Sequence, residues 1–249
     1  DLRRKTREEA IKICLEFLEE ERPAFIQDWK NIGSSCDFDI LYSTIDKNSI
    51  FVSQKSFLDL AKKERVYRKE APIIWDTVFQ TAIAQAELQD KEMKSFFNDL
   101  IFKTESGENL IIATTRPELL GACVSIFVNP NDKRYKKLIG KKAITPLYNS
   151  KVPIMSDERV DIEKGTGVVM CCTFGDLTDV EWYKQYNLPL KMLINLDGRM
   201  NEHSGKYSGM KIVEARKKII EDLKSLGLLK HQKEITHVVQ VGERSGEPV

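Results

Sequence analysis

Two aspartates three positions apart, Asp176 and Asp179, follow a run of small and apolar residues that reads GTGVVMCC. An aspartate at the start of a helix accepts hydrogen bonds from backbone N–H groups that the helix leaves free. Two ionised carboxylates in one pocket have a second use, because together they can hold an ammonium group and accept a hydrogen bond from a hydroxyl. Taken alone, the pattern favours the helix cap and leaves the binding pair open.

A second polar group ends the apolar run LIIATT, where Thr114 and Thr115 supply small hydroxyls and Arg116 supplies a planar guanidinium. A guanidinium matches phosphate oxygens in a fork geometry. Pro117 and Glu118 follow where a helix would begin. The plainer interpretation is a strand-to-helix cap through Thr115, and the alternative is a binding site at the end of the strand.

Basic residues are concentrated in NDKRYKKLIGKK, residues 131–142. Such a run can follow a nucleic-acid backbone. On composition alone, a solvated surface is the commoner outcome. The residues that we predict to contact nucleic acid are Lys133, Arg134, Lys136 and Lys137.

The spacing of the glycines and cysteines argues against a phosphate loop, a metal site and a thiol nucleophile. Neither common phosphate-loop pattern follows Gly165 and Gly167, so a tight entry into a strand is favoured. The five cysteines form no C-x-x-C pair, and adjacent Cys171 and Cys172 would point to opposite faces of a strand. No histidine base lies near them in sequence, which disfavours a thiol nucleophile. We therefore predict no metal site and no cofactor.

Composition narrows the class of protein. The chain has 249 residues, of which 41% are hydrophobic and 31% charged, with a formal net charge of +1. That balance argues against a disordered tail and against a strongly basic nucleic-acid binder. No apolar run approaches the roughly 20 residues of a membrane helix, and the opening DLRRKTREEA lacks the apolar stretch of a signal peptide. We predict a soluble, cytoplasmic protein with no membrane partner.

Helical patterns flank a β-rich centre. A capping box at Thr6 and Glu9 opens a helix that we expect to be interrupted near Pro23 and to stop at Gly33. Further helices are expected over 49–66 and 211–230, with a last strand over 231–249. Short strands are expected at 110–115, 123–129, 141–147, 152–155, 166–172 and 190–198. The pattern predicts an α+β fold whose strands form a barrel or sandwich.

Several stretches, taken in order, resemble the editing domain inserted in valyl-tRNA synthetases, in its archaeal-type branch. They are IIATTRPELLGACVSIFVNPNDKRYKKLIGKKAITPLY, VPIMSDERVDIEKGTGVV, GDLTDVEWYKQYNLPL and EARKKIIEDLKSLGLL. The resemblance implies a β-barrel editing domain with short flanking helices over residues 93–231. It also implies that residues 1–92 are a helical segment of the synthetase body and that residues 232–249 form the strand returning to it.

The same resemblance implies two absences. Neither of the ATP-binding signatures of the aminoacylation site, HIGH and KMSKS, occurs in the chain, so it should not activate an amino acid. Members of this family often carry a zinc knuckle built from two cysteine pairs. Asp76, Phe79 and Ser245 stand at the matching positions, which places zinc in doubt.

Residue roles are likewise implied by motif position. Asp179 resembles the residue that holds the α-ammonium of the substrate, and Asp176 the one that reads a threonine hydroxyl. Thr114, Thr115 and Arg116 match positions near the terminal adenosine and the ester. Asp179, Thr114 and Thr115 form the predicted catalytic set. The predicted substrate-binding set is Asp176, Asp179, Arg116, Glu118, Met170 and Cys172, with Glu118 the weaker candidate and Met170 confined to packing or shape.

The implied function is hydrolysis of threonine from mischarged tRNA for valine. Valine and threonine are nearly isosteric, and a hydrophobic pocket of this enzyme class rejects threonine only weakly. The implied partners are the acceptor end of that tRNA carrying threonine and the remainder of the synthetase. Two alternatives stay open: a tRNA-binding module that is inactive in isolation, and a leucyl- or isoleucyl-type editing domain.

Overall fold

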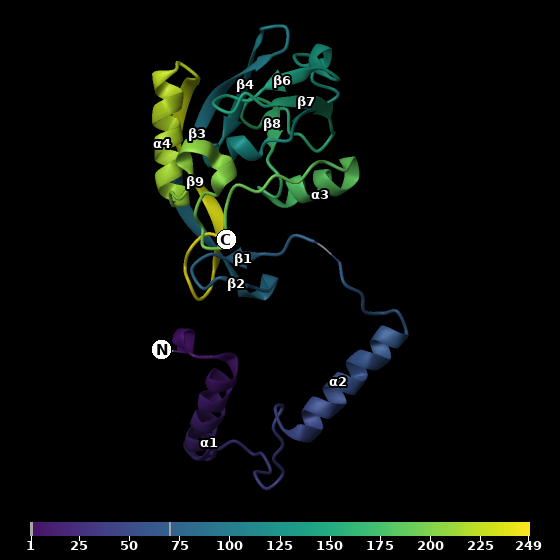
Figure 1. Cartoon of the computed structure of the whole chain (residues 1–249), viewed down its shortest axis with the longest axis vertical. Helices are drawn as coiled ribbons and strands as arrows, with labels where there is room; N and C mark the ends of the chain where they lie inside the picture. The colour runs from purple at the N-terminus through teal and green to yellow at the C-terminus, as the bar shows by residue number, and fades with distance from the viewer. Residues whose placement is uncertain (1, 70) are drawn as a thin grey trace. The chain divides into compact units, whose positions relative to one another are not determined.

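The computed structural model describes residues 2–69 and 71–249, and it divides the chain into two compact units (Figure 1). The first unit comprises residues 1–70 and the second comprises residues 71–249. The expected boundaries at 92/93 and 231/232 remain proposals, and both fall inside long strands described below.

The first unit contains two long helices, α1 (Arg7–Asn31) and α2 (Lys47–Lys62), after a short 3-10 turn η1 (Leu2–Arg4). The expected capping box is present, since Glu9 N donates to Thr6 Oγ1 at 3.3 Å and Thr6 N donates to Glu9 Oε2 at 2.9 Å. The expected interruption at Pro23 is wrong, because α1 continues through it for 25 residues. An internal proline removes one backbone donor, and the turns on either side here keep their own hydrogen bonds.

The second unit is built on a seven-stranded sheet with the order β4-β3-β6-β7-β5-β8, and β9 pairs with β3 outside this path. Its strands are β3 (Leu88–Thr104), β4 (Asn109–Thr114), β5 (Ser125–Val128), β6 (Lys142–Ile144), β7 (Lys151–Ser156), β8 (Val168–Cys171) and β9 (Leu229–Gly242). All pairings are antiparallel except that of β5 with β7. A separate hairpin joins β1 (Trp75–Asp76) to β2 (Thr81–Ala82).

Helices cover parts of this sheet. Figure 1 shows α4 (Ile212–Ser225) alongside β9, whereas α3 (Leu177–Tyr186) follows β8 at the other side of the unit. Short 3-10 helices lie in the connections: η2 (Gln85–Glu87), η3 (Pro117–Ala122), η4 (Lys136–Leu138) and η5 (Glu202–Tyr207). The structure is therefore α+β, as predicted.

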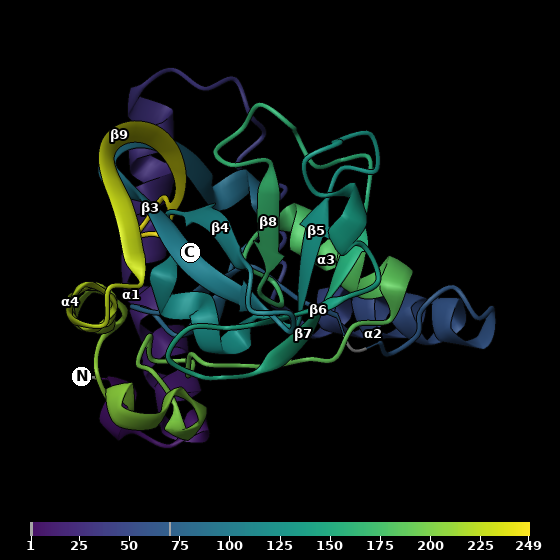
Figure 2. The same ribbon diagram turned by 90° about the horizontal axis from the view of Figure 1, so that it is seen from above.

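The sheet curls toward a barrel. Its two ends, β4 and β8, are in contact and lie next to each other when seen from above (Figure 2). No register pairing joins them in the part of the chain that the structure describes, so the hydrogen-bonded path is open at this place. The carboxyl end of β4 is thereby brought to the same side of the sheet as β8 and the loop that follows it.

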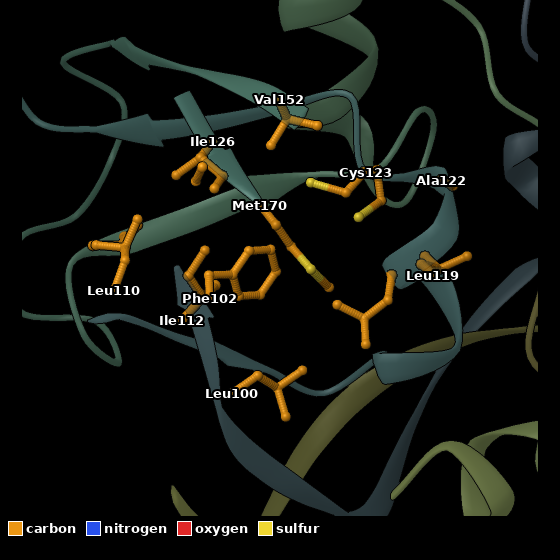
Figure 3. Close-up of a cluster of buried hydrophobic side chains, with 14 of the residues drawn as sticks. Leu100, Phe102, Leu110, Ile112, Leu119, Ala122, Cys123, Ile126, Val152 and Met170 are labelled. Carbon is orange, nitrogen blue, oxygen red and sulfur yellow. The ribbon is translucent and has the colours of Figure 1, made fainter. Parts of the chain in front are cut away.

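Side chains from both faces of the curl form the core. Figure 3 shows Phe102, Ile112 and Met170 converging with Leu119 inside the sheet. A smaller second cluster surrounds Phe127, whose ring stacks on that of Trp182 at 4.2 Å between centroids. The core therefore holds β8, η3 and α3 in fixed relation.

Five of the six expected short strands are present as β4 to β8, and the last one is wrong. Residues 190–198 form no strand, since Ile194 makes an isolated bridge to Met200 and residues 196–198 lie in a turn. The long strand β3 was not expected as a unit. Its side chains alternate between half-buried and exposed from Met93 to Phe97 and between buried and less buried from Asn98 onward, whereas residues 89–92 are all exposed, so only the start of β3 lacks a strand period.

A hydrogen-bonded turn lies at the positions that match the cysteines of the zinc knuckle. The buried carboxylate of Asp76 accepts from Val78 N at 2.8 Å and from Phe79 N at 2.9 Å, and Ser245 donates its hydroxyl. Burial raises the pKa of Asp76, but these hydrogen bonds lower it overall. Among residues 2–69 and 71–249, no group of three His, Cys, Asp or Glu side chains could hold a metal ion. In the same residues, no helix is both long and apolar enough to cross a membrane.

Candidate active site

Asp176 caps α3 and remains exposed. Its Oδ1 accepts a hydrogen bond from Asp179 N at 2.9 Å, so the helix-cap interpretation of this residue is correct. Its Oδ2 accepts no hydrogen bond from any residue that the structure describes. The cap therefore fixes the carboxylate and leaves one oxygen free, and a role in reading a hydroxyl stays a prediction.

Asp179 lies one turn further along and is buried, with 5% of its surface exposed. Its Oδ2 accepts from Gly175 N at 3.1 Å and from Cys172 N at 3.4 Å. Burial, followed by the negative charge of Asp176, raises the pKa of Asp179 to about 6, although hydrogen bonds from Cys171, Cys172 and Gly175 act in the opposite direction. No Lys, Arg or His of the described chain forms an ion pair with it.

The loop between β8 and α3 is closely fitted to this carboxylate. A Cβ atom on Gly175 would lie 2.6 Å from Asp179 Oδ2, so only glycine fits without displacing the acid. Phe174 adopts φ +64°, an uncommon left-handed conformation for a residue with a side chain. Its ring packs edge-on against Tyr183 of α3, 5.0 Å between centroids, which holds the loop in that conformation.

The predicted strand-end group meets this loop directly. Arg116 donates from Nη1 to the carbonyl oxygen of Gly175 at 2.9 Å, and Arg116 N donates to Thr114 Oγ1 at 3.0 Å. Thr115 is half-buried between them in sequence. The contact between β4 and β8 therefore brings together Thr114, Arg116, Asp176 and Asp179. The two pairs of residues lie about 60 positions apart along the chain.

Glu118 is buried between two arginines. Its side chain is fully buried and accepts from Arg116 Nε at 3.3 Å and from Arg216 of α4 at 2.8 Å to each oxygen. Both oxygens of Glu118 already receive guanidinium donors, which favours a structural role, and contact of Glu118 with substrate stays a prediction. Sequence reasoning missed Arg216, because nothing in the sequence pairs α4 with a residue 98 positions earlier.

The family model described as "tRNA synthetases class I (I, L, M and V)" matches residues 2–240. The chain belongs to this family. It is 52% identical over 244 residues to a valine–tRNA ligase of Rickettsia akari (strain Hartford), covering 98% of this chain and 30% of that protein. It is 40% identical over 301 residues to a valine–tRNA ligase of Wolbachia pipientis wMel, covering 98% of this chain and 35% of that protein.

This class I synthetase chain therefore spans about a third or less of the length of these relatives. A solved structure, described as the ternary complex of Agrobacterium radiobacter K84 agnB2 LeuRS-tRNA-LeuAMS, is similar at 17% identity with a TM-score of 0.45. The matched region covers 78% of this chain and 33% of the chain in that structure.

Adjacent Cys171 and Cys172 of the synthetase chain, at the end of β8, point to opposite faces of the sheet, as predicted. Cys172 packs in the main core with Met170, whereas Cys171 packs in the smaller cluster with Trp182. Burial raises the pKa of both thiols well above the ordinary value. Protonated, buried thiols are poor nucleophiles. Met170 and Cys172 belong to the main core, and direct contact of either with a ligand stays a prediction.

The basic run of the synthetase chain lies on the surface around η4. Arg134 is bound to the buried carboxylate of Asp132 through two nitrogens, the shorter distance being 2.7 Å, and it also donates to the Ile162 carbonyl at 3.0 Å. Lys137 approaches Glu108 at 3.5 Å. Arg134 therefore joins two loops of the unit, whereas Lys133 and Lys136 have no ion-pair partner in the described chain.

The tight turn before β8 also follows from its glycines. Gly167 adopts φ +75°, and a Cβ atom there would lie 2.6 Å from Arg134 Nη2 and 2.9 Å from the Ile162 carbonyl oxygen. Gly165 has φ +61°. The glycines thus serve as a strand entry, which agrees with the favoured interpretation of the sequence.

Proposed function

We propose that this chain hydrolyses the ester of mischarged threonyl-tRNA for valine, as the editing part of a valine–tRNA ligase. The observation that carries the proposal is a buried carboxylate, Asp179, with no cationic partner in the described chain and a pKa raised to about 6. A buried acid in this state, beside an exposed acid, marks a functional site on physical grounds. The relationship to valine–tRNA ligases supports this reading.

In this proposal, the cation that pairs with Asp179 is the α-ammonium group of an aminoacyl ester. Oδ2 of Asp179 accepts hydrogen bonds from the backbone N–H groups of Gly175 and Cys172. Oδ1 is therefore the oxygen that we propose accepts a hydrogen bond from the ammonium group. A cation at that place favours the ionised acid, since an opposite charge within a few ångströms lowers the pKa of a carboxyl. Binding of substrate then supplies the charge balance that the protein lacks.

Discrimination is assigned to Asp176. Its free Oδ2 is proposed to accept a hydrogen bond from the threonine hydroxyl, while its Oδ1 is fixed by the α3 cap. A methyl group in place of that hydroxyl leaves the carboxylate without a partner, which costs about 1 to 3 kcal/mol when the site excludes water. Valine esters are therefore expected to escape hydrolysis.

The ester itself needs positioning more than a protein nucleophile. Aminoacyl esters are activated, and holding a water molecule and the carbonyl in register accounts for large rate gains. Thr114 and Thr115 are proposed to place these groups. The hydroxyl of Thr114 already accepts from Arg116 N, so its proton points elsewhere and is available to donate.

The test is ester loss from threonyl-tRNA and valyl-tRNA, both made on tRNA for valine, compared with the spontaneous rates. Selective loss of threonine that disappears in Asp179→Ala and is weakened in Asp176→Ala supports the proposal. Equal losses for all aminoacyl groups in Asp176→Ala contradict hydroxyl reading and favour a leucyl- or isoleucyl-type substrate. No acceleration by the native chain rejects hydrolysis by the chain alone.

A tRNA-binding module is the second candidate function, favoured by the exposed Lys133, Lys136 and Lys137 around η4. The chain spans 30% of its Rickettsia relative, and in this proposal the remainder of a synthetase provides further affinity. Binding of tRNA that weakens steeply with salt, without ester loss, would support it. Charge reversals at the lysines that leave binding unchanged would reject it. Location in the cytoplasm and the domain limits 93–231 belong to the same proposal.

A further inference from the structure

Two arginines from different elements share one buried acid, Glu118. Arg216 of α4 donates from Nε to Oε2 and from Nη2 to Oε1, both at 2.8 Å. Arg116 adds only one bond, from Nε to Oε1 at 3.3 Å. Glu118 is fully buried, so these donors provide all of its charge balance within the described chain.

The other end of Arg116 reaches the site. Its Nη1 donates to the Gly175 carbonyl oxygen at 2.9 Å, and Gly175 N donates to Asp179 Oδ2 at 3.1 Å. An unbroken chain of contacts therefore runs from α4 through Glu118 and Arg116 to the loop that carries both aspartates.

The division of donors between the two arginines has a physical consequence. A buried carboxylate that loses a guanidinium is left with an uncompensated charge, and it recruits whatever cation is nearest. Arg116 is that cation. Closing a fork-to-fork pair with Glu118 through Nε and Nη2 would turn the rigid, planar guanidinium of Arg116 and move Nη1 away from the Gly175 carbonyl oxygen.

We propose that Arg216 is a positioning residue for this site. By holding both oxygens of Glu118, it keeps Arg116 from closing onto the acid and leaves Nη1 on the Gly175 carbonyl. The loop is then fixed with Asp176 and Asp179 in place. The effect on catalysis rests on the deacylation proposed above, whereas the effect on the loop does not.

The first test compares Arg216→Met with the control Lys217→Met, an exposed neighbour on the same helix without a hydrogen-bond or ion-pair partner in the described chain. Amide hydrogen exchange is measured for Gly175 in the loop and for Ile219 and Leu223 in α4. In Arg216→Met, the Gly175 amide should exchange about tenfold faster or more, while the α4 amides change little, because opening is local. Uniformly faster exchange, or an unchanged Gly175 amide, overturns the proposal.

The second test removes the competing charge. In the double variant Glu118→Gln with Arg216→Met, no buried carboxylate attracts Arg116, so protection of the Gly175 amide should return to within about threefold of the native value. Loss of packing by the arginine alone predicts no such recovery. A double variant as unprotected as Arg216→Met, or worse, sinks the mechanism.

Kinetics separate this inference from the proposed function. Deacylation of threonyl-tRNA should lose kcat in Arg216→Met with KM for tRNA nearly unchanged, and should partly recover in the double variant. A loss confined to KM contradicts positioning of the loop. If the native chain deacylates nothing, the proposed function fails, and the exchange experiments still decide whether Arg216 positions the loop.

Discussion

The two units of the chain differ in how much surface they bury. In the part of the first unit whose burial the structure describes, residues 2 and 4–69, no residue is buried, and large side chains such as Phe17, Phe25 and Trp29 are between 45% and 63% exposed. In the second unit, Leu100, Phe102 and Ile126 are completely buried. Caps and periodicity are sufficient to define helices, but only the second unit has a core of its own.

This difference has a direct reading for stability. Isolated helices are marginal in water, because most helical stability comes from tertiary packing of an apolar face. The apolar stripes on α1 and α2 are therefore faces that the described residues of the first unit do not bury. We propose that the remainder of a synthetase covers them, in keeping with the 30% of the Rickettsia relative that this chain spans.

The largest expected effect comes from separating the units. Residues 71–249 expressed alone should unfold cooperatively in urea, whereas residues 1–70 alone should show weak helical circular dichroism and no cooperative transition. A sharp transition in the shorter piece would show that it forms a core, and would break the comparison.

The next effect contrasts two phenylalanines. Phe102→Ala in the second unit removes a completely buried ring and should cost about 3 to 5 kcal/mol of unfolding free energy. Phe17→Ala on α1 removes a ring that is 57% exposed and should change stability by less than about 0.5 kcal/mol. Urea titrations of the two variants measure both values. Similar losses would mean that Phe17 is covered in solution.

A third prediction uses two aspartates with opposite pKa shifts. Burial raises the pKa of Asp179 in the second unit to about 6, so as the pH rises this carboxyl ionises in the unfolded chain before it ionises in the folded protein. The free energy of unfolding should therefore fall as the pH rises from about 4 to about 6, and then level off. Asp179→Asn should remove this fall, which is on the order of 3 kcal/mol. Urea midpoints across that range are the measurement.

Asp46 supplies the contrast in the first unit. It caps α2, and the backbone hydrogen bond from Ser49 lowers its pKa, so its contribution is present above about pH 4 and is lost only as the pH falls further. Asp46→Asn should leave the pH 4 to 6 region unchanged. A flat profile for the native chain in that region would show that Asp179 is not held as described.

The last prediction concerns activity and compares two glycines. Gly175→Ala would place a Cβ atom 2.6 Å from Asp179 Oδ2 and should slow the proposed deacylation by about 100-fold, since displacement by an ångström costs about that much. Gly33→Ala in the first unit has open space around it and strains only its own backbone at φ +80°. It should leave ester loss unchanged in the same assay. Equal activity of the two variants would contradict the close fit at Gly175.

Much of the fold follows from local sequence. The Thr6 and Glu9 box, the glycine turn before β8 and the opposite orientation of Cys171 and Cys172 were each predicted and observed. Helix α1 passes through Pro23, and residues 190–198 form no strand, because a single proline or a β-like composition does not decide these outcomes. For residues 190–198 the outcome depends on pairing with distant segments, which no short stretch of sequence reveals.

The sequence by itself determined where the chemistry-bearing groups stand along the chain and how each begins or ends an element, since a cap or turn involves hydrogen bonds within a few residues. Only the tertiary structure decided that Asp179 is buried while Asp176 stays exposed, and that Glu118 is held by Arg216 from 98 positions away. Desolvation and long-range ion pairs depend on which segments the curled sheet brings together. The same two aspartates therefore acquire different environments from one fold.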